Sequence, residues 1–162
     1  MSTGAFDGSR PDRFLALRAL LAFLALPGLL AYALPLLVVQ PPHVRALWQW
    51  AGLLLVGAGS CLLLLCVYEF YAEGRGTLAP WSPPRHLVES GPYRISRNPM
   101  YVAIVTVLLG WATWFGSPGL LAYALAVAVA FHVRVITYEE PTLARSFEND
   151  WRRYRERVRR WL

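Results

Sequence analysis

The sequence predicts an all-α, polytopic membrane protein with four transmembrane helices plus a C-terminal amphipathic cytoplasmic helix, forming a single membrane domain over residues 1–162. Apolar residues make up 56% of the chain and charged residues 16%, whereas an average soluble domain carries roughly 25% charge. The apolar residues are gathered into long runs, and most arginines lie outside those runs. The runs therefore predict the helices, and the arginines predict their orientation.

The first two apolar runs are each long enough for one membrane span. Residues 14–39 contain a single charge, Arg18, and residues 46–68 contain none. A bilayer-spanning helix needs roughly 17–25 apolar residues, so we expect helices at about 14–39 and 46–70. A cleaved signal peptide is the alternative for the first run, but its apolar region would be shorter. The prolines in this run predict a retained, kinked helix.

The third run, residues 100–133, has no charge across 34 positions and is long enough for two shorter helices. A turn is predicted in its middle by Gly116-Ser117-Pro118-Gly119. We therefore expect helices at about 99–115 and 119–138.

Two cysteines, Cys61 and Cys66, lie in the second predicted helix. Their spacing of five residues puts them on different faces, and the apolar run 46–68 contains no histidine or acidic residue. We expect neither a disulfide nor a metal site there.

All 16 basic residues are arginine, and their positions predict the orientation of the chain. Two precede the first helix, four lie in the segment 71–98, and seven follow the fourth helix, whereas the opposite side has only Arg45. The positive-inside rule therefore places both termini and the loop 71–98 in the cytoplasm. We expect a multi-pass protein of a bacterial inner membrane. Attraction to anionic lipid explains the net charge of +6, so no nucleic-acid partner is expected, and no obligate protein partner is evident.

Polar residues concentrate in two segments. The first is 71–101, which contains three glycines and five prolines and therefore cannot be one regular helix. Long ordered loops of this kind are often functional. Within it, Asn98-Pro99 suits the entry to the third predicted helix, because proline is favoured in the first turn of a helix.

The second polar segment begins where the fourth predicted helix ends. Glu139 and Glu140 lie at the membrane boundary, and Pro141 predicts a kink or break near 138–141. Adjacent carboxylates at such a position are costly unless a cation is close. Arg97, Arg134 or a ligand ammonium could supply it; alternatively, the pair faces water.

Beyond this point the sequence predicts an amphipathic helix at about 142–160. Apolar residues recur every three or four positions among charged ones, at Leu143, Phe147, Trp151, Tyr154 and Val158. Such a helix either lies on the cytoplasmic membrane surface as an anchor or folds back over the helix bundle.

Several short motifs follow one another in these two segments. They are His86-Leu87, Gly91-Pro92-Tyr93 and Arg97-Asn98-Pro99-Met100-Tyr101, followed about 40 residues later by Glu139-Glu140, Leu143, Phe147 and Tyr154. Together they resemble the isoprenylcysteine carboxyl methyltransferase family, whose wider group includes the phospholipid N-methyltransferases. The resemblance covers the motif-bearing half, 74–162. It implies S-adenosylmethionine as methyl donor, bound on the cytoplasmic side, and a lipophilic small-molecule acceptor that arrives through the lipid bilayer.

The resemblance also implies a set of cofactor-binding residues, namely His86, Leu87, Gly91, Tyr93, Arg97, Asn98, Pro99, Tyr101, Glu139 and Glu140. We expect Arg97 to pair with the donor carboxylate and one of the two glutamates to bind the donor ammonium or ribose. Tyr93 and Tyr101 would face the sulfonium or the adenine. His86 is either a supporting residue or simply solvated.

Arg134 and Asn98 are the candidate catalytic residues. Arg134, near the bilayer boundary, would contact the polar group of the acceptor, or else extend to the lipid headgroups. Asn98 stands where the family pattern has histidine and cannot take up a proton near neutral pH. A carboxylate acceptor is already ionised and needs no base, whereas an amine or thiol would need another group. Ala103 and Glu148 stand where the family pattern commonly has glycine.

Two other functions are compatible with parts of the sequence. Membrane sterol reductases, which use a nicotinamide cofactor, carry a related tail but are usually longer, and the Glu-Glu-x-x-Leu ending favours the methyltransferase. A non-catalytic protein on the same scaffold is the third possibility, because of Asn98.

Overall fold

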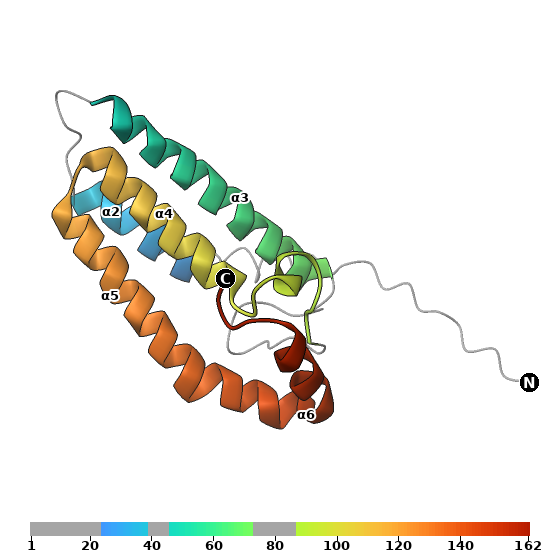
Figure 1. Ribbon diagram of the computed structural model, residues 1–162. Coiled ribbons are helices and arrows are strands. Elements are labelled where there is room, and N and C mark those ends of the chain that lie inside the picture. Colours follow the sequence, from blue (N-terminus) through green and yellow to red (C-terminus); the bar gives the residue numbers. More distant parts are fainter. Residues whose placement is uncertain (1–23, 39–45, 73–86) are drawn as a thin grey trace, which may run out of the picture.

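The computed structural model describes residues 24–38, 46–72 and 87–162, and every regular element in these ranges is helical (Figure 1). The predicted all-α class is therefore confirmed for this part of the chain. The start of the helix expected at 14–39 lies outside the described residues, as does His86. In chain order the elements are η1 (Leu24–Ala33), α2 (Leu34–Val38), η2 (Leu47–Gln49), α3 (Trp50–Ala72), η3 (Gly91–Arg94), α4 (Pro99–Phe115), α5 (Pro118–Arg134), η4 (Val135–Glu139) and α6 (Glu140–Arg157).

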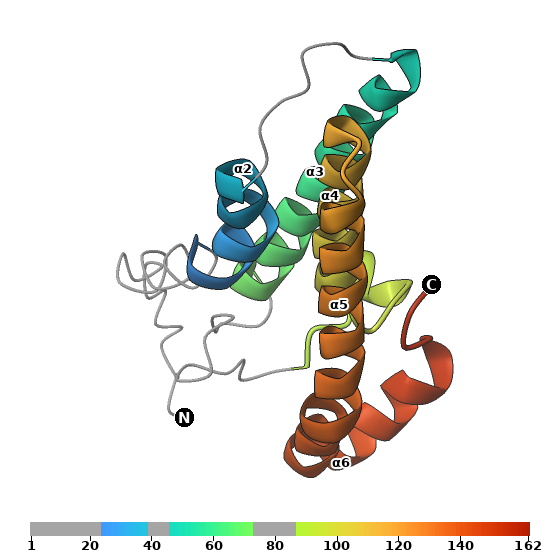
Figure 2. The ribbon, with the colours of Figure 1, turned by 90° about the vertical axis from the view of Figure 1, so that its left-hand side faces the viewer.

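Helices α3 and α4 pack closely because small residues let their backbones approach each other (Figures 1 and 2). A Cβ atom at Gly52 would lie 2.5 Å from the backbone nitrogen of Trp114, and one at Gly59 would lie 2.9 Å from the carbonyl oxygen of Ala103. Ala103 is fully buried. Its methyl group is accommodated here because the neighbouring residue on α3 is itself a glycine.

The connection between α4 and α5 is the predicted tight turn. Gly116 has a φ of 60°, a left-handed conformation in which glycine is favoured because it has no Cβ. The Ser117 side chain then accepts a hydrogen bond of 3.3 Å from the backbone nitrogen of Leu120 and caps α5. The turn makes α4 and α5 neighbours along their length.

The described part of the first predicted helix is irregular, as its prolines predict. The wide π-helical element η1 contains Pro27 and passes into the short α2. Tyrosines attach this segment to the bundle: the Tyr32 hydroxyl lies 2.6 Å from Ser60 Oγ of α3, and the Tyr123 hydroxyl of α5 donates to the carbonyl of Leu30 at 3.3 Å.

Within the described residues, two helical stretches are long and apolar enough to cross a membrane. They are Leu47–Glu69 and Pro118–Arg157, the second of which includes α6; Pro27–Leu37 and Pro99–Phe115 are apolar but shorter. Large apolar side chains remain exposed on α3 and α5, among them Leu54, Leu64, Leu125 and Val129. Extensive exposed apolar surface indicates contact with another apolar phase, as expected of a membrane protein.

Of the kink or break predicted near 138–141, the structure contains no break. Instead, α5 continues through the π-helical turn η4 directly into α6 (Figure 1). Pro141 has no backbone N–H and its ring would crowd the carbonyl of Thr137 in a regular helix. A wider turn immediately before the proline accommodates both effects without ending the helix.

The amphipathic helix forms as predicted, but it ends at Arg157 rather than at 160. Its two central aromatic residues, Trp151 and Tyr154, are buried at 4% and 2% exposure. They pack on the protein, so this face of α6 is folded back over the bundle and is not available as a membrane anchor. Residues 158–162, which we call the tail, leave the helix in an extended conformation that starts at Val158 (φ −120°, ψ 132°).

A kink inside α6 lies at Glu148, one of the positions where the family pattern commonly has glycine. Glu148 has φ 33° and ψ −100°, a strained conformation for a residue with a Cβ. We expect Glu148→Gly to raise the free energy of unfolding by about 1 kcal/mol, because glycine adopts such angles without steric cost. Ala144→Gly, at an exposed helical position of the same element, is the control and should lower it by about 1 kcal/mol. Thermal unfolding in detergent measures both; equal destabilisation by the two changes would contradict the strain.

Candidate active site

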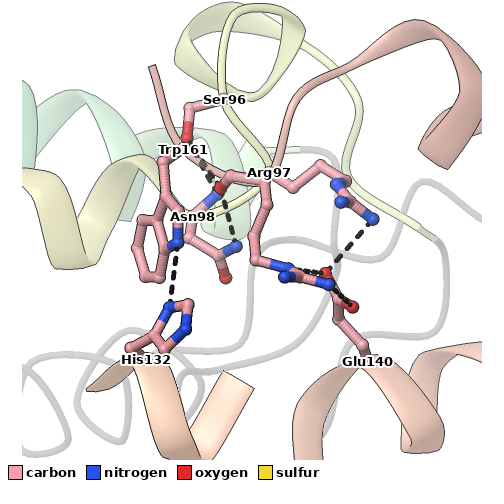
Figure 3. A network of polar contacts seen from close by, with 7 residues as sticks. Ser96, Arg97, Asn98, His132, Glu140 and Trp161 are labelled. Atoms are coloured by element: carbon pink, nitrogen blue, oxygen red, sulfur yellow. Dashed lines mark hydrogen bonds and ion pairs between the residues drawn. The ribbon is translucent and has the colours of Figure 1, made fainter. Parts of the chain in front are cut away.

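Three segments that are distant in the sequence meet at one end of the helix bundle. They are the stretch leading into α4, the junction between α5 and α6, and the tail (Figures 1 and 3). Most of the residues predicted to bind the methyl donor lie on the first two of these segments. The junction and the tail each add charged or aromatic partners.

The centre of the site is a carboxylate held between two guanidinium groups (Figure 3). Arg160 makes two parallel hydrogen bonds to Glu140, from Nε to Oε1 at 2.8 Å and from Nη2 to Oε2 at 2.9 Å. Arg97 Nη1 lies 3.2 Å from the same Oε1. Of the two alternatives left open for the glutamate pair, a nearby cation or exposure to water, the structure shows the first, with Arg160 as a further partner.

Arg97 is buried, with 8% of its side chain exposed. Its guanidinium lies over the Trp151 ring, 5.3 Å from the ring centroid. Within the described residues, its Nε and Nη1 atoms make no hydrogen bond. Burial lowers the pKa of Arg97, and the charge of Glu140 opposes that shift, but an arginine remains protonated in proteins. Arg97 is thus a buried cation that is ion-paired with Glu140 through Nη1 but has donors without a hydrogen bond to a described residue.

The electrostatics of Glu140 follow from the same contacts. Burial alone would raise the pKa of this carboxyl, but the hydrogen bonds from Arg160 and the charge of Arg97 outweigh it and lower the pKa. Glu140 is therefore ionised at neutral pH and stays so under mildly acidic conditions. The folded state holds Glu140 in its ionised form. The ionised carboxylate therefore stabilises the folded state above the ordinary glutamate pKa, and this stabilisation is lost as the pH falls through the lowered pKa of Glu140.

The neighbouring glutamate belongs to a different cluster. Glu139 Oε1 accepts a hydrogen bond of 2.8 Å from Arg134 Nε and another from the Tyr101 hydroxyl. The Tyr101 ring stacks on Phe131, with ring centroids 4.2 Å apart. The two adjacent carboxylates thus point to different arginines, and neither side chain is fully exposed to water, with 26% of Glu139 and 13% of Glu140 accessible.

Asn98 holds the tail against the start of α4. Its Nδ2 donates to the carbonyl of Arg160 at 2.9 Å, and the preceding backbone nitrogen, of Arg97, donates to the carbonyl of Arg159 at 2.9 Å. Ser96 pairs with Arg159 in an isolated parallel bridge, and its hydroxyl also contacts the Arg160 carbonyl at 3.3 Å. The side chain that stands in place of the family histidine is therefore engaged with the backbone of the tail.

The remaining predicted residues lie on the side of α3. Tyr93 is buried beside Cys66 and Val88, and burial raises the pKa of its hydroxyl well above the ordinary value. Its carbonyl accepts a hydrogen bond of 2.8 Å from the Tyr154 hydroxyl. Gly91 has a φ of 52°, and a Cβ there would collide with the Glu69 carboxylate.

Leu87 is partly buried, and Pro99 is the buried first residue of α4. Leu87, Gly91 and Tyr93 are thus separate from the Arg97–Glu140 cluster in the contacts that they make.

Sequence reasoning did not single out four residues of this region, Ser96, His132, Arg160 and Trp161. Trp161 Nε1 donates to His132 Nδ1 at 3.2 Å, which connects the tail to the last turn of α5 (Figure 3). Arg160 is one of seven arginines after the fourth predicted helix, so nothing in its spacing distinguishes it. The available signal was that an arginine and an aromatic residue, Arg160 and Trp161, are adjacent just after the amphipathic repeat.

A surface hollow of about 410 Å³ lies on another part of this end of the molecule. It is lined by the charged residues Glu89, Asp150, Arg153, Glu156 and Arg157. None of the predicted donor-binding residues lines it.

The fold and the site define an all-helical protein with membrane-length apolar helices and a buried arginine–glutamate cluster at one end. The chain belongs to the phospholipid methyltransferase family, which matches residues 47–150. The predicted family relationship is thereby confirmed. An uncharacterised protein of Haemophilus influenzae is similar, with 32% identity over 63 residues, which are 39% of this chain and 100% of the relative. No solved structure matches the chain.

Proposed function

We propose that this protein is an S-adenosylmethionine-dependent membrane methyltransferase that acts on a lipophilic acceptor. The observation that carries the proposal is Arg97, a buried guanidinium with unused donors inside one of the motifs of a methyltransferase family. A buried polar group normally has its hydrogen bonds satisfied. The carboxylate of the donor would supply the missing acceptor, and guanidinium geometry favours two parallel bonds to it.

Other residues would complete the donor site. S-adenosylmethionine, when bound, supplies a methyl group activated by its sulfonium. Glu139, partly exposed and near Tyr101, is the better placed of the two glutamates for the donor ammonium or ribose, because both Glu140 oxygens already accept from Arg160. Thr142 Oγ1 is a further buried polar atom with no hydrogen-bond partner among the described residues. The protein's contribution to such a transfer is mainly to position the two reactants.

Arg134 is the proposed contact for the acceptor. Its side chain is 51% exposed at the end of α5, and its guanidinium lies 5.5 Å from the centroid of the Tyr138 ring. An anionic or polar lipid group at this boundary would meet a cation already oriented by Glu139. We place Asn98 beside the reacting groups only as a hydrogen-bonding residue, since an amide cannot remove a proton.

We further propose that the chain crosses the membrane four times with both termini in the cytoplasm. The arginine distribution supports this orientation. Helix α4 has 17 residues and would span about 25 Å, close to the thickness of the hydrocarbon core. The site would then lie on the cytoplasmic side, where the donor is available, in the inner membrane of a bacterium.

The test is ligand binding to the full chain purified in detergent, measured by isothermal titration calorimetry. We expect saturable binding of S-adenosylhomocysteine, the product of the donor, and no binding of NADPH, which serves as the control nucleotide. Absence of S-adenosylhomocysteine binding by a folded sample would refute the proposal, and NADPH binding alone would indicate a reductase.

A further inference from the structure

Arg160 reaches the site from the tail, beyond the family match at 47–150. Its guanidinium occupies both oxygens of Glu140, and 33% of its side chain is exposed. The Arg160 carbonyl is itself held by Asn98 Nδ2 and Ser96 Oγ. These contacts fix the backbone of Arg160 close to Glu140. They therefore limit the positions that its guanidinium can take.

The three charges of the cluster do not cancel. Arg97 and Arg160 contribute two positive charges, and Glu140 contributes one negative charge, so the cluster carries a net charge of +1. With Arg160 in place, both Glu140 oxygens accept hydrogen bonds, and Arg97 is in ion-pair contact with Glu140 while its Nε and Nη1 make no hydrogen bond to a described residue. Without Arg160, Arg97 would be the ion-pair partner that remains to this carboxylate among the described residues, and the attraction between the two would draw them closer together.

We propose that Arg160 is a positioning residue, which holds both oxygens of Glu140 so that Arg97, in ion-pair contact with Glu140 through Nη1, keeps hydrogen-bond donors for the carboxylate of the methyl donor. The inference rests on the proposed function and makes the tail a part of the donor site. It also assigns Glu140 to orienting the two arginines. The competing interpretation is that Arg160 blocks Glu140 and must leave before the donor ammonium can bind there. The two interpretations predict opposite effects of removing Arg160.

The test compares two probes on two variants of the full chain. S-adenosylhomocysteine carries the amino-acid carboxylate, and 5′-methylthioadenosine lacks the whole amino-acid part. We expect Arg160→Met to weaken S-adenosylhomocysteine binding by about 10-fold, the usual scale for one hydrogen bond to a charged group, and to leave 5′-methylthioadenosine binding unchanged. Arg159→Met is the matched control, because the Arg159 side chain is exposed and contributes only its backbone to the contacts above.

Two further variants separate a positioning role from a structural one. Arg160→Lys should restore part of the affinity, since the charge returns without the paired geometry. Adding Glu140→Gln to Arg160→Met should also restore part of it, because the carboxylate that competes for Arg97 is removed. Unchanged or tighter S-adenosylhomocysteine binding by Arg160→Met would overturn the inference, as would equal weakening of both probes. If the unmodified protein binds neither probe, it is the proposed function that fails.

Discussion

Replacing Arg97 by methionine is expected to weaken S-adenosylhomocysteine binding by about 10- to 100-fold, the range for a lost charge-assisted hydrogen bond. Arg97 is the buried group with unused donors at the proposed carboxylate site. Methionine is flexible and apolar, so it can fill the space over Trp151. Because Glu140 keeps both hydrogen bonds from Arg160, the substitution does not leave an unpaired buried carboxylate. Titration calorimetry on the purified variant measures the effect.

The matched control is Arg152→Met on α6. Arg152 is an exposed arginine that contacts Asn149 of the same helix, so its loss should change the affinity by less than a factor of about two, as for most surface positions. Circular dichroism would check that both variants remain helical. If Arg97→Met binds S-adenosylhomocysteine as tightly as Arg152→Met does, then Arg97 does not hold the donor carboxylate.

Gly52→Ala should be the most destabilising of the conservative changes to the membrane helices, with an expected loss of about 1–3 kcal/mol. A Cβ at this position would lie 2.5 Å from the Trp114 nitrogen and 2.6 Å from the Gly110 oxygen. Both are backbone atoms, so α3 and α4 must separate to admit the methyl group. The dispersion contacts along the interface would weaken with that separation.

Gly57→Ala in the same helix provides the control. A Cβ at Gly57 meets no atom within 4 Å, and alanine is favoured over glycine in a helix by up to about 1 kcal/mol. The two variants therefore make the same chemical change, with opposite expected effects on the free energy of unfolding. Thermal unfolding in detergent gives the comparison, and a Gly52→Ala variant as stable as Gly57→Ala would show that α3 and α4 do not pack at this distance.

Much of the fold was predictable because long apolar runs can bury their side chains and pair their backbone groups in few ways other than as helices. The expected helices at 46–70 and 99–115 agree with α3 and α4, and the turn at Gly116 follows from local backbone chemistry that needs no tertiary information. At Pro141 the sequence left a kink or a break open, and the structure has a π-helical turn without a break. The local rule was correct that a regular helix cannot accept proline, but a single wide turn removed the conflict.

The candidate site was predictable in part. For the two adjacent glutamates the sequence left open a nearby cation or exposure to water, and the structure shows two of the suggested cations, Arg97 and Arg134, beside them. Their pairing with particular carboxylates depends on how α4 and α5 are rotated, which spacing does not reveal. The role of Arg160 depends on a backbone bridge between Ser96 and Arg159, residues 63 positions apart. Long-range backbone pairing of this kind leaves no periodic signal in the sequence.

The position of the tail has a consequence for the order of folding. Helices α3 and α4 pack through contacts that involve no residue of the tail. Until the tail docks, Glu140 has no contact with Arg160, and Asn98 has no carbonyl from that residue to hold. The packing of the helices and the assembly of the arginine–glutamate cluster are therefore separable events, because only the second needs the tail.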